Sequence, residues 1–362
     1  MSWRVLLGLS LLTLGPLHPG QQAQGQTIEP PTPEQVAAAQ QAPLFSSHGI
    51  LRMTLEADFH AIRREDRSDE DSQQRPAVMR WESSSGATEI QDIQLQTRGN
   101  FRLSRRNCDF PPLRINVKKE PTKGTLFEGQ DKLKLVVPCK LRQSYWEQYV
   151  VLEYLAYRAL NVLTDLSFRV RPAVVTFEDS SGEDDPFTRF AFIIEDDDDL
   201  AIRNGNWKVD WPGGQLDPRM VDPHHAILVD VFQYMIGNTD WSGVQMHNIE
   251  LIKEPWGLYV TVPYDFDFSG IVNARYAEPD PRVGIRSVTD RRFRGFCPDE
   301  VGRDRESYEE IFQLFRDKKE EIYGLFREQE GLEPRYLRDT EEFLDEFYQT
   351  LGDQRRIERW IF

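Results

Sequence analysis

The sequence predicts an α+β fold in two parts, with a strand-rich first half that one long helix crosses and a mainly helical second half. Three stretches between residues 90 and 137 alternate apolar and polar side chains, which is typical of strands. Residues 145–163 contain apolar side chains throughout and no Gly or Pro, which predicts a long, buried helix. The tail after Ser307 has the spacing of amphipathic helices with charged outer faces.

The strands of the first half can be placed individually from their alternation. Their predicted ranges are 50–55, 93–97, 113–117, 132–137, 170–177 and 187–194. A polar turn at 179–185 joins the last two strands into a hairpin, and the densely charged residues 63–76 predict a solvated loop. The acidic run from Glu195 to Asp199 is either a solvated turn or a hinge between the two halves.

The second half begins with a clear helix signal. Asp222 and Pro223 provide an N-cap and a proline at the first helical position, and residues 226–236 are apolar on nearly all faces. Gly237 and Asn238 are typical C-terminal stop residues. Two short strands at 248–252 and 257–262 follow, and two tail helices are separated by a break near 331–334.

The N-terminus has the layout of a secretory signal peptide. A short basic stretch precedes a mostly apolar run at 5–14, which is too short to span a bilayer, and small residues around 23–25 suggest a cleavage site. An uncleaved membrane anchor is the alternative. We therefore expect a signal peptide at 1–25, a linker or loose helix at 26–47, an N-terminal lobe at 48–200 and a C-terminal lobe at 201–362. The mature chain, periplasmic or extracellular, would have no membrane span.

Charge and cysteine content exclude several classes of protein. The 362-residue chain has a formal net charge of −16, which argues against binding to nucleic acid or to anionic lipid. The three cysteines form no zinc-binding pattern. Cys108 and Cys139 could form one disulfide, with Cys297 left as a buried thiol.

Polar residues with the chemistry of a phosphoryl-transfer site cluster between residues 238 and 267. A loop carboxylate, Asp240, is followed by Asn248 at the start of a strand and by Asp265 and Asp267 after the return strand. Phosphoryl transfer needs one carboxylate that orients the attacking hydroxyl, and an amide oxygen and a second carboxylate that hold a divalent cation. Asp265 and Asp267 would repel each other on one strand face, and a bound cation would remove that cost.

The motifs in this region resemble those of known kinases. The stretches Gly237-Asn238-Thr239-Asp240, His247-Asn248 and Pro263-Tyr264-Asp265 resemble the catalytic core of HipA-type kinases. The wider layout resembles spore-coat-protein-H-type (CotH) kinases, with an Arg-Gly-Asn turn at 98–100 before a basic strand and a long helix. The resemblance covers roughly residues 90–275. It implies a two-lobed protein-kinase-like fold, ATP as the nucleotide, and Mg²⁺ or Mn²⁺.

The resemblance also assigns roles to individual residues. It implies Asp240 as the catalytic base, and Asn248 and Asp265 as metal ligands, with Asp267 as a further ligand. Asn238 would support them, and from its own chemistry His247 is a hydrogen-bonding support, a metal ligand or a base. Asp240 and Asn248 lie eight positions apart, however, which is longer than the usual kinase loop. The extra residues either bulge harmlessly or displace Asp240, which would make the chain a pseudokinase.

The cation that holds the nucleotide phosphates is harder to assign. Arg114, Lys118 and Lys134 lie on or near predicted strands, with Arg114 matching the basic strand of the resembling families best. Glu147 or Glu153 on the long helix would be the ion-pair partner of that cation. No glycine-rich phosphate loop is present.

The basic, aromatic segment at 291–297 would face a phosphate or an acidic substrate, or pair with the protein's own acids. Two readings compete with an active phosphotransferase that acts on an unknown hydroxyl acceptor. One is a pseudokinase that serves as a binding module at the cell envelope. The other is a metal-dependent phosphoester hydrolase that uses the same carboxylates and His247.

Overall fold

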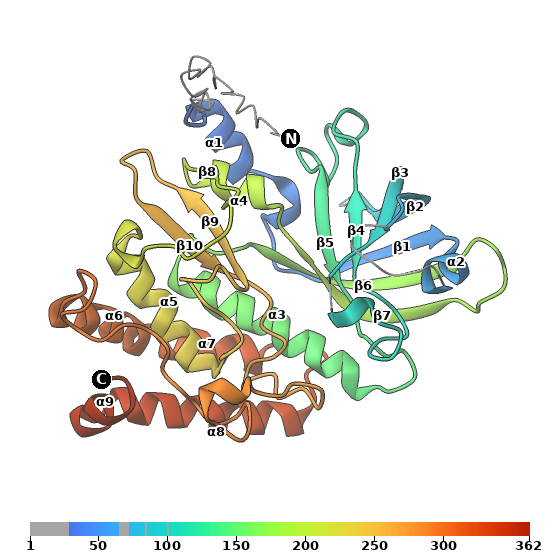
Figure 1. Ribbon diagram of the computed structural model, residues 1–362. Helices are drawn as coiled ribbons and strands as arrows, with labels where there is room; N and C mark the ends of the chain where they lie inside the picture. Colours follow the sequence, from blue (N-terminus) through green and yellow to red (C-terminus); the bar gives the residue numbers. More distant parts are fainter. Residues whose placement is uncertain (1–28, 65–71, 84, 100) are drawn as a thin grey trace, which may run out of the picture.

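The computed structural model describes residues 29–64, 72–83, 85–99 and 101–362 (Figure 1). The predicted signal peptide at 1–25 lies outside these residues, as do Asn100 and residues 65–71 of the predicted loop at 63–76. None of the described helices is both long enough and apolar enough to cross a membrane.

The strand-rich half closes into a seven-stranded barrel in the order β1-β2-β3-β4-β5-β7-β6. Neighbouring strands pair antiparallel except β1 and β6, which pair in parallel with Leu51 opposite Ala173 and complete the closure. The strands are β1 (Leu51–Ala57), β2 (Arg75–Glu82), β3 (Thr88–Thr97), β4 (Leu113–Asn116), β5 (Lys132–Val136), β6 (Val170–Asp179) and β7 (Phe187–Ile194).

A second, three-stranded sheet has the order β10-β9-β8. It consists of β8 (Trp207–Lys208), β9 (Ile249–Lys253) and β10 (Tyr259–Pro263). The helices are α1 (Pro33–Gln40), α2 (Phe59–Arg64), α3 (Tyr145–Leu163), α4 (Asp197–Arg203), α5 (Pro223–Ile236), α6 (Arg305–Asp317), α7 (Lys319–Arg327), α8 (Pro334–Leu351) and α9 (Gln354–Trp360). In Figure 1, α3 runs between the barrel and the helices α5 to α8.

This architecture confirms the α+β class but shows that the two-lobed protein-kinase-like fold implied by the motifs is wrong. A closed barrel, a separate small sheet and a set of helices take its place. The residue pattern identified six of the seven barrel strands but neither β2 nor the closure, because alternation gives the faces of a strand and not its distant partner. The division into lobes at 48–200 and 201–362 stays a prediction; strands β1 to β7 precede residue 200, and helices α5 to α9 follow it.

Two hydrophobic cores hold the fold together. One fills the barrel with the inward residues of its strands, among them Leu55, Met79 and Ile115, all fully or almost fully buried. The other joins α3 to α5, to the tail helices and to the small sheet. Helix α3 is buried on nearly every face because these two sets of elements cover it.

Several local predictions are corrected. The acidic run at 195–199 is neither a solvated turn nor a bare hinge, because Glu195 is fully buried between Arg169 and Arg203 and Asp196 caps α4. The predicted linker contains α1, followed by the buried Leu44 and Phe45. The tail contains α6 to α9 rather than two helices, because the long segments on either side of 331–334 are each interrupted.

Candidate active site

A cavity of about 610 Å³ lies where the barrel, α3 and the small sheet meet. Strands β4 and β5 contribute Arg114 and Lys134, which are register partners, and α3 contributes Glu153. The loops around β9 and β10 contribute the remaining predicted residues, namely Asp240, His247, Asn248, Asp265 and Asp267. Asn238 does not line this cavity, and neither do the alternative candidates Lys118 and Glu147.

Asp240 is positioned by the end of α5. Gly237 ends the helix with φ 65°, a left-handed conformation that glycine adopts without penalty. The chain then turns, and the side-chain oxygen of the buried Asn238 accepts a hydrogen bond of 2.9 Å from the backbone N–H of Asp240. Asn238 therefore supports the loop, as its predicted role required, without reaching the cavity.

The carboxylate of Asp240 is held on both oxygens. Its Oδ1 lies 3.0 Å from Nε2 of His247, and Nδ2 of Asn248 donates to its Oδ2 at 3.2 Å. The same Nδ2 donates to the backbone carbonyl oxygen of Asp240 at 2.7 Å. Because 40% of the Asp240 side chain remains accessible, the carboxylate can still meet a substrate.

The long spacing between Asp240 and Asn248 forms a small hairpin. Ser242 and His247 exchange two backbone hydrogen bonds of 3.0 Å, which closes the residues between them into a tight turn. The insertion thus bulges away from the site, and Asp240 and Asn248 remain in direct contact.

Asn248 and Asp265 both adopt left-handed backbone conformations, with φ of 52° and 63°. Such conformations are uncommon outside glycine and persist where surrounding contacts enforce them. Here the N–H of Tyr264 donates to the carbonyl of Asn248 at 3.1 Å, and the N–H of Asp265 donates to the hydroxyl of Tyr157 at 2.8 Å. These bonds fix the two residues on the adjoining ends of β9 and β10.

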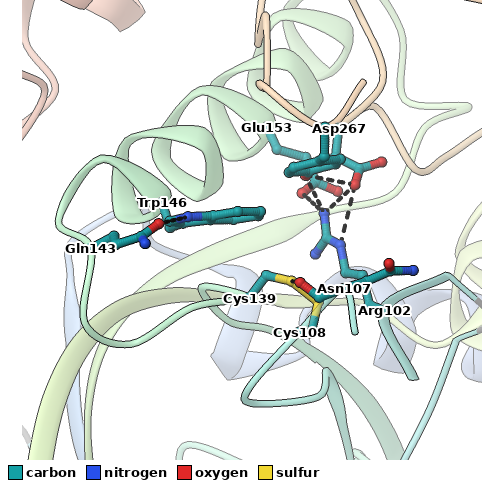
Figure 2. The surroundings of a disulfide bond; sticks show 9 residues. Arg102, Asn107, Cys108, Cys139, Gln143, Trp146, Glu153 and Asp267 are labelled. Atoms are coloured by element: carbon teal, nitrogen blue, oxygen red, sulfur yellow. Dashed lines mark hydrogen bonds and ion pairs between the residues drawn. A yellow bond between two sulfur atoms is a disulfide. The ribbon is translucent and has the colours of Figure 1, made fainter. Parts of the chain in front are cut away.

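A buried ion-pair cluster closes one end of the cavity (Figure 2). Arg102, in the short helix η2 (Phe101–Leu103), approaches Asp267 Oδ2 at 2.6 Å and Glu153 Oε2 at 3.1 Å. The hydroxyl of Tyr276 also donates to Asp267, at 2.8 Å. The partner of Glu153 is therefore Arg102, and not Arg114 or Lys134 as the sequence suggested. Glu147 lies elsewhere and accepts from the backbone of Phe190.

Burial dominates the electrostatics of this cluster. It raises the pKa of Glu153, an effect that Arg102 opposes and that Asp267 and Asp265 reinforce. Burial and the neighbouring Asp267 also raise the pKa of Asp265. For Arg102, burial favours the neutral form, but Asp267, Tyr276 and Glu153 together raise its pKa well above the usual value. The cluster thus holds more carboxylates than positive charges, so an added cation would be stabilised here.

The barrel supplies cations to the opposite wall of the cavity. Lys134 pairs with Asp197 and lies 5.0 Å and 5.6 Å from the ring centres of Phe168 and Tyr264. Burial lowers its pKa, and Asp197 opposes that effect. Arg114 lies beside Lys134 and forms no ion pair with the described residues, so its guanidinium is available to an anion.

The oxygen atoms at the site fit a magnesium ion. Among the described residues no group of three or more His, Cys, Asp or Glu side chains is gathered as a metal site. Mg²⁺ does not require one, because it commonly takes one or two carboxylates and completes its shell with water and phosphate. Asn248 commits its amide nitrogen to Asp240, which leaves its oxygen as a ligand beside Asp265. Asp267 is already engaged by Arg102 and Tyr276.

The sequence did not reveal Arg98, Arg102 or Tyr276 as site residues. Arg98 was noted only as part of the Arg-Gly-Asn turn, and it lines the cavity close enough to influence the pKa of Asp265. Arg102 follows the same turn, which was the one available signal. No protein-family model matches this chain, and no curated protein matches it either.

Proposed function

We propose that this chain is an exported phosphotransferase that moves a phosphoryl group, or a nucleotidyl group, from ATP to a hydroxyl acceptor with Mg²⁺ or Mn²⁺. One observation carries the proposal: a single cavity gathers a half-accessible carboxylate, an amide–carboxylate pair and several cations. The motifs shared with HipA-type and CotH kinases support the same chemistry, although the fold they implied is wrong.

The cavity has a group for each requirement of phosphoryl transfer. Asn248 and Asp265 would hold the divalent cation, which supplies positive charge beside the phosphates. Arg98, Arg114 and Lys134 would bind the phosphate oxygens, since all three line the same cavity. Glu153 and Asp267 hold Arg102 in place at the end of the cavity.

Asp240 would act on the acceptor. Its carboxylate takes the proton of the attacking hydroxyl as that oxygen bonds to phosphorus and the bond to the departing ADP breaks. His247 at 3.0 Å and Asn248 at 3.2 Å fix the direction of the carboxylate. Because these contacts orient a carboxylate whose side chain stays 40% exposed, they favour hydroxyl activation over a purely structural role.

Replacing Asp240 tests the proposal. We expect Asp240→Asn to lower the rate of ADP formation and of phosphoryl transfer by about 10²–10⁴-fold, because a positioned base contributes about that much. Asp210→Asn is the matched control, since the Asp210 side chain is 97% exposed and does not line the cavity. Transfer is followed with labelled Mg·ATP to the chain itself and to serine and sugar acceptors.

The same assay separates the competing functions. ATP binding without turnover in the unaltered chain would favour a binding module, and cleavage of phosphoesters with metal alone would favour a hydrolase. Equal rates in Asp240→Asn and the control would remove Asp240 from the chemistry.

Export is the remaining part of the proposal. A disulfide joins Cys108 and Cys139, and such bonds persist in oxidising compartments outside the cytosol. Cys297 is free and partly exposed, so the prediction of a buried thiol there is wrong. Fractionation of cells that express the tagged full chain would contradict export if the protein stayed cytosolic.

A further inference from the structure

A second hollow, which we call the arginine pocket, lies beside the loop that carries Asp240. Its volume is about 420 Å³, and it lies between the short helix η5 (Pro281–Val283), the segment 292–294 and the tip of the 242–247 hairpin. Its lining residues are Gln245, Asp280, Arg282, Val283, Arg292 and Arg294.

The arginine pocket is positively charged on an acidic protein. Three arginines face one carboxylate, and Asp280 is occupied by Arg282, whose Nε lies 3.0 Å and 2.9 Å from its two oxygens. Arg292 is exposed and forms no hydrogen bond or ion pair with the described residues. On a chain with a formal net charge of −16, such a surplus of cations favours binding of an anion.

Arg294 connects this pocket to the candidate base. Its guanidinium donates to the backbone carbonyl oxygens of Thr239 and of Trp241, the latter at 2.9 Å, and so grips the residues on both sides of Asp240. Gln245 lies on the hairpin whose His247 hydrogen-bonds to Asp240. The pocket and the base therefore share one short segment of chain, with the hairpin between them.

We propose that the arginine pocket binds an anionic group of the acceptor, so that the preferred acceptor carries a carboxylate or phosphate near its reacting hydroxyl. This inference rests on the proposed phosphotransferase function and adds the substrate class. Arg291 makes structural contacts with α5 and α8, and Arg294 holds the Asp240 loop, whereas Arg292 has no such structural partner. An acceptor lying across the hairpin would place its anion on Arg292 and its hydroxyl at Asp240.

Matched acceptors test the inference. They also distinguish the two kinds of acceptor that could carry the anionic group, an acidic peptide and a small hydroxy acid. The peptides contain one serine flanked by glutamates or by lysines, and the small molecules are glycerate and glycerol. Peptide binding is measured by fluorescence anisotropy without nucleotide, and transfer to all four with Mg·ATP. In at least one pair, we expect the acidic member to be preferred at least about tenfold in affinity or in rate of transfer. This preference should decrease with added salt.

Two charge-reversal variants test whether the preference for acidic acceptors depends on the arginine pocket. Arg292→Glu should remove most of the acidic preference, because it places a carboxylate where the anion binds. Arg286→Glu is the matched control, because Arg286 is also exposed and lies outside the pocket. Equal losses in both variants would indicate general attraction and overturn the inference.

The outcomes also separate this inference from the proposed function. If Mg·ATP binds and transfer occurs but neither acidic acceptor is preferred, the arginine pocket is not an acceptor site and the phosphotransferase remains. If the acidic peptide binds through Arg292 while Mg·ATP does not bind, the anion site stands and the proposed function fails.

Discussion

Arg102 is the residue on which the electrostatic balance of the cavity depends. Its guanidinium is the positive charge that contacts both Asp267 and Glu153, whose side chains are only 6% and 2% exposed. Removing one partner of a buried pair leaves an uncompensated charge, which costs far more than the pair itself contributes. Arg102 should therefore influence the stability of the fold and also the binding of any nucleotide that enters the cavity.

Arg102→Met tests this dependence, because methionine preserves much of the volume without the charge. We expect the free energy of unfolding to fall by about 3–5 kcal/mol at pH 7, measured by urea denaturation. The exposed Arg106→Met should stay within about 0.5 kcal/mol of the unaltered chain. If Arg102→Met matches that control, the buried cluster is not held by this side chain.

The contrast between Arg102 and Asp240 shows what the sequence can reveal about a site. Asp240, Asn248 and Asp265 belong to a short stretch with a recognisable order, and the structure places all three around one cavity. Arg102 lies 51 residues from Glu153 and 165 from Asp267, so no local pattern links it to either partner. The same distance explains why the cation paired with Glu153 was wrongly predicted.

At the scale of elements, individual helices and strands were predicted closely. Helix α3 and strand β7 have the predicted bounds, because a helix without Gly or Pro and a hairpin strand are both defined by local residues. Strand β2 was missed because its start was assigned to the charged loop predicted at 63–76, and β8 was missed because two residues carry no periodicity. Closure of the barrel depends on the parallel pairing of β1 with β6, and no local pattern encodes that partner.

The loop between β3 and β4 is held in place by a disulfide. It carries Arg102 and is joined by the disulfide from Cys108 to Cys139, just after β5 (Figure 2). The backbone N–H groups of Asp109 and Phe110 also donate to the carbonyl oxygen of Cys139, at 2.9 Å and 3.2 Å. These bonds place the loop against the start of α3.

Loss of this disulfide should destabilise the chain. For a separation of 31 residues, chain entropy predicts a loss of about 3–4 kcal/mol in the free energy of unfolding of Cys108→Ser/Cys139→Ser. Cys297→Ser is the control, because that thiol forms no disulfide. The comparison is made by urea denaturation, and similar values for the double variant and the control would contradict a structural role.

At the scale of the whole molecule, buried titratable groups set the pH dependence of stability. Burial raises the pKa of Asp199 and Glu250 to about 7, so each lowers the free energy of unfolding as pH rises from its ordinary pKa near 4 to about 7, and the loss levels off above that value. Burial lowers the pKa of His225 to about 4, so its contribution to stability is lost as pH falls from about 6.5 to about 4. The two effects oppose each other below pH 6.5.

Stability should therefore decline as pH rises to about 7.5 and then level off. We expect the free energy of unfolding to fall between pH 6.5 and about pH 7.5, because Asp199 and Glu250 are still ionising there while the contribution of His225 is complete, and Asp199→Asn to make this decline smaller. The neighbouring, exposed Asp198→Asn serves as the control. A free energy of unfolding that stays constant or rises over this range would show that the buried carboxyl groups do not set the pH dependence of stability.

The central claim is that Asn248 and Asp265 hold a divalent cation under a nucleotide in the cavity. Calorimetric titration of ATP with and without Mg²⁺ into the unaltered chain, Asp265→Asn and Asp210→Asn tests it most directly. We predict Mg²⁺-dependent binding that Asp265→Asn weakens by at least about tenfold and Asp210→Asn leaves unchanged, since a charged ligand to the metal is lost. Absence of ATP binding, or equal affinity in all three proteins, would contradict the claim.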